Sequence, residues 1–394
     1  MTKVELASGI YWVGAIDWNI RNFHGYTTPH GTSYNAYLII DEKIALIDTV
    51  KAPFAQEMLD RIQEIVALKD IDYLISNHVE MDHSGSMPET MRHMTRALVV
   101  TTARGKEGLL RYHKIDWPFM VVKEGMELSL GRQKLQFVEA PMLHWPDNML
   151  VYLKGQRILF SSDAFGQHIA SSYRYADEVS GIIPEAAKYY ANIVMPYASM
   201  VLKALEKLRD TKVDIIAPSH GLIWRKAQDT ETIIGLYADW SQGKAKDKIL
   251  IVYDSMWQST EKMAKALLEG ISREGVEVKL FNLSNSDRSD IIREVLDSKA
   301  ILIGSPTLNR GLFPTVAGFL AYLKGLRPKA KLGTAFGSYG WSAGAVKAAY
   351  QELKEAGIEV IESGLEIPYV PDEEELKKCI AFGEKIARDI KTRG

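Results

Sequence analysis

The stretch Tyr73-Leu-Ile-Ser-Asn-His78-Val-Glu80-Met-Asp82-His83 places four potential metal ligands directly behind a short apolar run. Residues 73–76 predict a buried strand, because short apolar runs bounded by loop residues are typical of strands inside a protein. The four ligand side chains then lie in the loop at the strand's carboxyl end, where binding sites commonly form. Four donors can hold two metal ions only if further donors come from elsewhere in the chain.

Three further potential ligands have the same placement, each just past a predicted strand. They are His144 after the strand ending at Ala140, Asp163 after Ile158–Phe160, and His220 after Ile215–Ala217. A carboxylate such as Asp163 can bridge two ions, because each of its oxygens can bind one. The seven donors divide into His78, Glu80 and His144 for one ion, Asp82, His83 and His220 for the other, and Asp163 between them. Each ion then keeps an open position for a small molecule.

The donor types favour iron. A zinc hydrolase site would offer a second imidazole at the position where this chain has Glu80. An anionic oxygen makes the site harder and better suited to iron that changes its charge. The chain has one cysteine, Cys379, which excludes Cys-ligated zinc and iron–sulfur sites.

Composition describes an ordinary globular enzyme. The chain has 394 residues, of which 46% are hydrophobic and 25% charged, and this length allows two domains. Its net charge of -2 gives no electrostatic reason to expect nucleic acid as a partner. We see no signal-like N-terminus and no apolar run of about 18 residues, so we expect a cytoplasmic protein with no membrane contact.

A polar segment, Ser241–Asp247, predicts a linker, and we place the domains at residues 1–246 and 247–394. The first part is rich in short strands, such as Tyr34–Ile40 and Lys43–Ile47, which form a predicted hairpin across Asp41-Glu42. Strands in runs broken by a few helices predict sheets covered by helices.

The second part alternates strands and helices. Its predicted strands are 249–253, 276–281, 300–304, 331–336 and 359–362, and its predicted helices are 261–273, 290–296, 316–323, 343–356 and 373–391. Five strands alternating with five helices favour a doubly wound parallel sheet.

Three loops at carboxyl ends of these strands predict a flavin site. The first, with hydroxyls beside a helix N-terminus, suits a phosphate monoester, and neither a P-loop nor a G-x-G-x-x-G motif occurs. Helix capping is the default interpretation of one such loop, but three in succession predict FMN. The candidate residues are Ser255, Met256, Trp257, Gln258, Ser259 and Thr260, then Ser305, Pro306, Thr307, Leu308 and Asn309, and then Ser338, Tyr339, Gly340, Trp341 and Ser342.

With both sites placed, the chain resembles the flavodiiron protein family along almost its whole length. The family's H-x-E-x-D-H motif is intact at His78–His83, and its later ligands match His144, Asp163 and His220. The resemblance implies a metallo-β-lactamase-like αββα sandwich with two iron ions, followed by a flavodoxin-like five-stranded parallel sheet with FMN.

The same resemblance implies an activity and partners. The activity is reduction of O2 to water or of NO to N2O, and identical ligands serve both gases. The chain ends after the flavodoxin-like part, so electrons are expected from a separate donor such as rubredoxin. A head-to-tail homodimer, or a higher oligomer, is implied. His24, Tyr26 and Tyr197 are candidate proton donors in the iron pocket, because the family places similar groups there.

Two alternatives stay open at this point. One is a metal-dependent hydrolase of the same superfold with an accessory flavodoxin-like domain, in which a metal-bound hydroxide attacks the substrate. The other is a flavodoxin-like electron carrier whose first domain only binds a partner. Glu80 and the complete set of seven donors count against both.

Overall fold

The chain folds into two compact units. The computed structural model describes residues 4–393, so residues 1–3 and 394, at the outer ends of the two predicted domains, lie outside the described residues. The first unit extends to Tyr190 and includes Ser199–Ala238, while Ala191–Ala198 belongs with the second unit, which resumes at Asp239. The domain boundary at residue 246 stays a prediction.

The predicted linker is too long at both ends. Helix α7 (Ala227–Gln242) continues to Gln242, and strand β17 (Lys246–Tyr253) begins at Lys246, which leaves residues 243–245 between them. The polar composition of this segment reflects the solvent-facing ends of a helix and a strand rather than an irregular chain.

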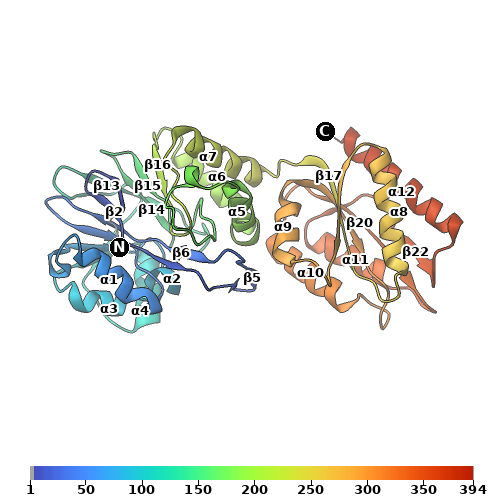
Figure 1. Ribbon diagram of the computed structural model, residues 1–394, viewed down its shortest axis with the longest axis horizontal. Helices are drawn as coiled ribbons and strands as arrows, with labels where there is room; N and C mark the ends of the chain where they lie inside the picture. The colour runs from blue at the N-terminus through green and yellow to red at the C-terminus, as the bar shows by residue number, and fades with distance from the viewer. Residues whose placement is uncertain (1–3, 394) are drawn as a thin grey trace. The chain divides into compact units, whose positions relative to one another are not determined.

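Two sheets form the centre of the first unit (Figure 1). The first has the order β1-β2-β7-β8-β9-β10-β11 and the second β12-β13-β14-β15-β16. The strands of the first sheet are β1 (Val4–Ala7), β2 (Ile10–Trp12), β7 (Tyr37–Ile39), β8 (Ala45–Ile47), β9 (Tyr73–Ile75), β10 (Leu98–Thr101) and β11 (Phe119–Val121). Those of the second are β12 (Glu127–Ser129), β13 (Lys134–Glu139), β14 (Met149–Leu153), β15 (Ile158–Phe160) and β16 (Ile215–Ala217). Two small pairs, β3 (Ala15–Asp17) with β6 (Thr32–Tyr34) and β4 (Asn22–Phe23) with β5 (Tyr26–Thr27), complete the strands.

The core of this unit lies between the two sheets and under the helices. Tyr37 and Ile47 of one sheet pack with Phe137 and Phe160 of the other, and all four are buried. Strands β7 and β14 are buried at every position, which explains why they read as continuous apolar runs. The helices are α1 (Ala55–Gln63), α2 (Met81–Ser84), α3 (Met87–His93), α4 (Ala103–His113), α5 (Ile182–Tyr189), α6 (Ala198–Lys207) and α7. Because α1, α3 and α4 flank one sheet and α6 and α7 the other, the predicted αββα sandwich is confirmed (Figure 1).

The second unit is a parallel sheet in the order β18-β17-β19-β20-β21. Its strands are β17, β18 (Glu277–Asn282), β19 (Ser298–Gly304), β20 (Leu332–Tyr339), β21 (Glu359–Val360) and β22 (Leu365–Pro368). Its helices are α8 (Ser259–Arg273), α9 (Arg288–Asp297), α10 (Pro314–Leu326), α11 (Ala345–Glu355) and α12 (Glu373–Thr392). Helices α8 and α12 lie on one face of the sheet and α9 and α10 on the other, so the predicted doubly wound fold is confirmed (Figure 1).

The fifth strand of this sheet differs from the prediction. We expect one strand at 359–362, but β21 stops at Val360 and β22 resumes beside the same neighbour, β20. Gly364 lies between them, and a Cβ there would meet the backbone oxygen of Ala335 at 2.2 Å. This close approach to β20 breaks the strand in two, and only the tertiary contact reveals it.

Within residues 4–393, no helix combines the length and apolar character needed to cross a membrane.

Candidate functional site

Four segments of the first unit, each following a strand, bring the seven predicted metal ligands together. Strands β8 to β11 run parallel to one another, as do β15 and β16, so their carboxyl ends share an edge of each sheet. After β9, the loop carries His78 and Glu80, whereas Asp82 and His83 lie in the short helix α2 and not in the loop that the sequence predicts. The loops after β13, β15 and β16 carry His144, Asp163 and His220. His78, Asp82, His83, Asp163 and His220 are all buried.

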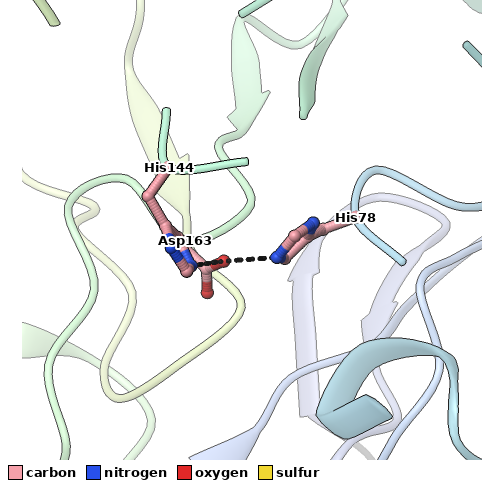
Figure 2. Close-up of side chains that lie close together, drawn as sticks. All are labelled: His78, His144 and Asp163. Atoms are coloured by element: carbon pink, nitrogen blue, oxygen red, sulfur yellow. Dashed lines mark ion pairs between the residues drawn. The ribbon is translucent and has the colours of Figure 1, made fainter. Parts of the chain in front are cut away.

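Asp163 lies between two groups of imidazoles. Its Oδ2 lies 3.3 Å from Nε2 of His144 and 3.7 Å from Nε2 of His78. In Figure 2 the imidazoles of His78 and His144 lie next to the Asp163 carboxylate. The other oxygen, Oδ1, lies 3.2 Å from Nε2 of His83 and 3.4 Å from Nε2 of His220. Each carboxylate oxygen therefore faces a different pair of nitrogens, which is the arrangement that a bridging ligand requires.

The other two carboxylates of the cluster, Asp82 and Glu80, each lie beside a different pair of imidazoles or a member of it. Oδ2 of Asp82 lies 3.0 Å from Nε2 of His220. Oε2 of Glu80 lies 3.3 Å from Nε2 of His78 and 3.5 Å from Nε2 of His144. Possible ligand atoms of His78, His144 and Asp163, and likewise those of Asp82, His83 and His220, lie within 4.8 Å of one another.

The cluster fits two cations. Oδ1 of Asp82, Oδ2 of Asp163 and Nε2 of His83 are buried with no hydrogen bond to any residue that the structure describes. Buried polar atoms without partners are costly, and a metal ion between them removes that cost. The far nitrogens of two imidazoles are occupied: Nδ1 of His78 donates to Asp147 Oδ2 (2.9 Å), and Nδ1 of His220 donates to the Ser33 carbonyl (2.7 Å). These contacts leave the Nε2 atoms facing the carboxylates.

The charges of the cluster also favour a cation. Burial raises the pKa of Asp163, but the imidazoles, His83 first, lower it well below its ordinary value. Burial lowers the pKa of His83, but the carboxylates of Asp82 and Asp163 raise it to about 10. The carboxylates of Asp82 and Asp163 thus stabilise a proton on His83. A metal ion bound at His83 would displace that proton.

A small hairpin brings His24 to the cluster. Strands β4 and β5 pair Phe23 with Tyr26, so His24 and Gly25 form a two-residue turn with φ values of 53° and 80°. Left-handed conformations at both positions are those of a type I′ turn. Nε2 of His24 lies 3.1 Å from Oε1 of Glu80, and 72% of the His24 side chain is exposed. His24 therefore lies between a predicted ligand and solvent.

The other two candidate proton donors are Tyr26 and Tyr197. Tyr26 is buried, with its ring 5.3 Å from that of His168, whose ring in turn lies 5.0 Å from that of His220. Tyr197 ends η5 (Met195–Tyr197), within the segment that belongs with the second unit. The pocket roles of both tyrosines stay predictions.

Three buried residues beside the cluster are not among those predicted from the sequence. Asp147 orients His78, Tyr189 donates its hydroxyl proton to Asp163 (3.1 Å), and His168 hydrogen-bonds Thr32 through Nδ1 (2.8 Å). Burial lowers the pKa of His168 well below its ordinary value, so it is neutral. Asp147 follows His144 by three residues, which was a usable signal, whereas Tyr189 lies in a helix with no local sign of the site.

The second unit contains a cavity of about 740 Å³ at the carboxyl edge of its sheet. Predicted flavin residues from all three loops line it: Met256, Trp257, Ser259, Pro306, Thr307, Leu308, Asn309, Ser338, Tyr339, Gly340, Trp341 and Ser342. Arg310, Tyr369 and Val370 line it as well, and the sequence reasoning missed them. A cavity of this size with aromatic walls suits a flat ring system.

Four predicted flavin residues are outside the cavity lining. Thr260 and Ser338 hydrogen-bond through their hydroxyls (2.9 Å), and the Ser305 hydroxyl accepts from the Phe313 amide (3.0 Å). Gln258 directly precedes α8 and has a left-handed φ of 66°. The hydroxyl of Ser255 is buried and has no hydrogen-bond partner among the described residues. An unpartnered hydroxyl just before α8 fits a phosphate group, because the first amides of a helix have no partner within the helix and can bind an anion.

The fold and the two sites define a two-domain protein in which a metallo-β-lactamase-like unit with paired His–carboxylate clusters precedes a flavodoxin-like unit. Residues 32–221 match the model of the ODP family beta lactamase, and residues 251–383 match that of flavodoxin. The chain is 50% identical to a nitric oxide reductase of Moorella thermoacetica, over 98% of each chain.

Two solved structures are similar over the whole chain. The rubredoxin oxygen:oxidoreductase of Desulfovibrio gigas has a TM-score of 0.97 and 41% identity, with 99% of each chain covered. The flavodiiron protein of Giardia intestinalis has a TM-score of 0.97 and 36% identity, with 100% of this chain and 97% of the other covered. This chain belongs to the flavodiiron protein family, so the oxidoreductase prediction is supported over the hydrolase alternative.

Proposed function

We propose that this protein reduces O2 to water, NO to N2O, or both, at two iron ions in the first unit, with electrons delivered through FMN in the second unit. The observation that carries the proposal is the Asp163 carboxylate, whose two oxygens face separate imidazole pairs. Imidazoles beside both oxygens favour two ions, one at each oxygen, over a single ion. The buried atoms without hydrogen bonds on both sides support two ions rather than one.

The distances support the proposed division of the ligands. His78, Glu80 and His144 would hold one ion, Asp82, His83 and His220 would hold the other, and Asp163 would supply one oxygen to each. When bound, iron supplies a reversible change of charge and Lewis acidity, and FMN stores two electrons.

The protein's own residues orient the ligands and control water and protons. Asp147 and the Ser33 carbonyl each accept a hydrogen bond from Nδ1, of His78 and of His220 respectively. These contacts fix the tautomer of each ring, so that the lone pair of Nε2 is available to bind a metal ion. The Trp145 ring packs edge-on to His78 at 5.2 Å and shields it from solvent. At the exposed side, Nε2 of His24 lies 3.1 Å from Oε1 of Glu80, so this imidazole is placed to pass a proton between solvent and the site.

The comparisons support the class of donor and of substrate. The similar proteins are named for rubredoxin, oxygen and nitric oxide, and we propose a separate rubredoxin-like electron donor and O2 or NO as substrate. We further propose a head-to-tail homodimer, or a higher oligomer, in the cytoplasm, with no membrane or nucleic-acid partner.

Turnover of the iron- and FMN-loaded protein, with either O2 or NO as the sole added gas, tests the proposal. Reduced rubredoxin is added, and the loss of O2 and of NO is followed in separate reactions. Fast loss of either gas with donor oxidation supports the proposal, and the ratio of the two rates assigns the substrate. No loss of either gas, with both cofactors shown to be present, contradicts it and favours the hydrolase, for which ester cleavage without reductant is the direct assay.

A further inference from the structure

The charge of the cavity in the second unit comes from one residue. Among the described residues that line it, Arg310 is the only charged side chain, and none is acidic. A bound group that gains negative charge would therefore meet a cation with no neighbouring carboxylate in the wall to offset it.

Arg310 is held in an unfavourable backbone conformation. The amides of Leu308 and Gly311 each bond the carbonyl of the other (3.1 and 2.9 Å), so Asn309 and Arg310 form the tip of a tight turn. Their φ values are 49° and 62°, the left-handed pair of a type I′ turn. Asparagine adopts this conformation readily, whereas glycine is the usual residue at the second position and arginine is disfavoured.

Neighbouring loops fix the turn in place. The Thr307 amide donates to the Ser338 carbonyl (2.8 Å), and the Thr307 hydroxyl accepts from the Ala345 amide (3.1 Å). A Cβ at Gly344 would lie 2.3 Å from the Arg310 carbonyl oxygen, so residue 344 packs directly against the turn. Strain of this kind persists where the surroundings enforce it, and such residues are often functional.

We propose that Arg310 stabilises the reduced form of the FMN held in this cavity and so raises its reduction potential. This inference rests on the proposed function. Two electrons from the protein donor and one proton from water convert oxidised FMN to its reduced form, whose ring carries one additional negative charge. A guanidinium in the wall attracts that charge and has no comparable attraction for the neutral oxidised ring.

The test uses the full-length, FMN-loaded protein under anaerobic conditions and at low ionic strength. Reference dyes set the potential, and the ratio of reduced to oxidised flavin is read from the absorption spectrum. Arg310→Gln should lower this ratio about three- to tenfold, and tenfold corresponds to about 30 mV for a two-electron couple. Arg310→Lys should restore at least half of the change in the flavin ratio. Added salt should reduce the difference in this ratio between wild type and Arg310→Gln.

Arg327 provides a matched control. It is exposed, lies in the same unit at the end of α10 with a left-handed φ of 49°, and is outside the cavity lining. Arg327→Gln should leave the ratio unchanged. A ratio for Arg310→Gln within twofold of wild type, or a shift equal to that of Arg327→Gln, would overturn the inference.

A second variant separates charge from backbone. Arg310→Gly should raise the thermal unfolding midpoint of the second unit, because glycine adopts this φ freely, and should lower the flavin ratio as Arg310→Gln does. An unshifted ratio in Arg310→Gly would also overturn the inference. A wild-type protein that binds no FMN would overturn the proposed function as well, whereas flavin that shifts as expected without O2 or NO turnover would overturn the proposed function alone.

Discussion

Asp147 shows how one side chain decides which nitrogen of a histidine is available. Its Oδ2 accepts from Nδ1 of His78 (2.9 Å) and from the Val79 amide (2.8 Å), so the ring is fixed with Nε2 toward Asp163. Carboxylate–histidine contacts of this kind raise the affinity of metal sites about 10- to 100-fold. They also explain why a residue that binds no metal is buried beside the cluster.

We expect Asp147→Asn to weaken iron binding by about tenfold or more, because the amide cannot supply the negative charge that polarises His78. Chelator competition measures the affinity, and FMN content should not change. Asp177→Asn is the control, since Asp177 forms ion pairs with Arg225 and Lys226 in the same unit. Equal affinities in the two variants would refute the role of Asp147.

We expect His24→Asn to slow donor-driven turnover roughly 10- to 100-fold while iron content is retained. Asparagine adopts the left-handed conformation of this turn, so the hairpin is preserved while the proton donor is lost. Steady-state rates with O2 and with NO are the measurement. Unchanged rates and an unchanged preference between the two gases would show that His24 has no role in the pocket.

Lys331 predicts a pH dependence of stability in the second unit. Its ammonium is buried and donates to the carbonyls of Leu296 and Ser298, and burial lowers its pKa to about 8. Between pH 8 and the ordinary lysine value of about 10.4, the unfolded chain binds more protons than the folded one, so this residue makes stability rise with pH. The free energy of unfolding should therefore increase more from pH 8 to 10 in wild type than in Lys331→Met, as measured by urea denaturation. The exposed Lys347→Met should behave as wild type.

At the scale of elements, α8 and α12 cross in direct backbone contact. A Cβ at Gly270 of α8 would meet the Ile380 carbonyl oxygen at 2.0 Å, and one at Gly383 of α12 would meet the Leu267 carbonyl oxygen at 2.5 Å. Glycine on both helices lets them approach more closely than side chains allow. Helix propensity opposes glycine at both positions, so packing decides them.

Alanine scanning of helical glycines tests this contact. Gly270→Ala should destabilise the second unit by about 1–3 kcal/mol through overpacking. Gly318→Ala, in α10 with open space around it, should stabilise the same unit by about 0.5–1 kcal/mol through helix propensity. Thermal or urea unfolding measures both, and stabilisation by Gly270→Ala would contradict the close crossing.

At the scale of the whole molecule, the two candidate sites belong to separate units. We expect Asp163→Ala to lose iron and all consumption of O2 and NO, because the bridge faces both groups of ligands. FMN content and reduction of the flavin by the donor should remain, since no described flavin-cavity residue lies in the first unit. Loss of FMN in this variant, or full gas consumption, would contradict separate sites.

Local sequence patterns predicted most of the elements and the loops that carry both sites. The ligands around His78 are visible because they are clustered in sequence behind an apolar strand, and His144, Asp163 and His220 because each follows a strand. Patterns of this kind do not report contacts between distant segments. The break at Gly364, the grouping of residues 191–198 with the second unit and the contact of Tyr189 with Asp163 therefore went unpredicted.

The amino-acid pattern is enough to predict the class of fold, the donor types and the family resemblance, because periodicity, residue chemistry and motif spacing are properties of the chain. The folded arrangement is needed to learn which carboxylate oxygen faces which imidazole, which residue orients His78, and that Arg310 lines the cavity. These are matters of distance and direction between loops far apart in the chain. They are settled when the sheets pack and bring the carboxyl ends of their strands together.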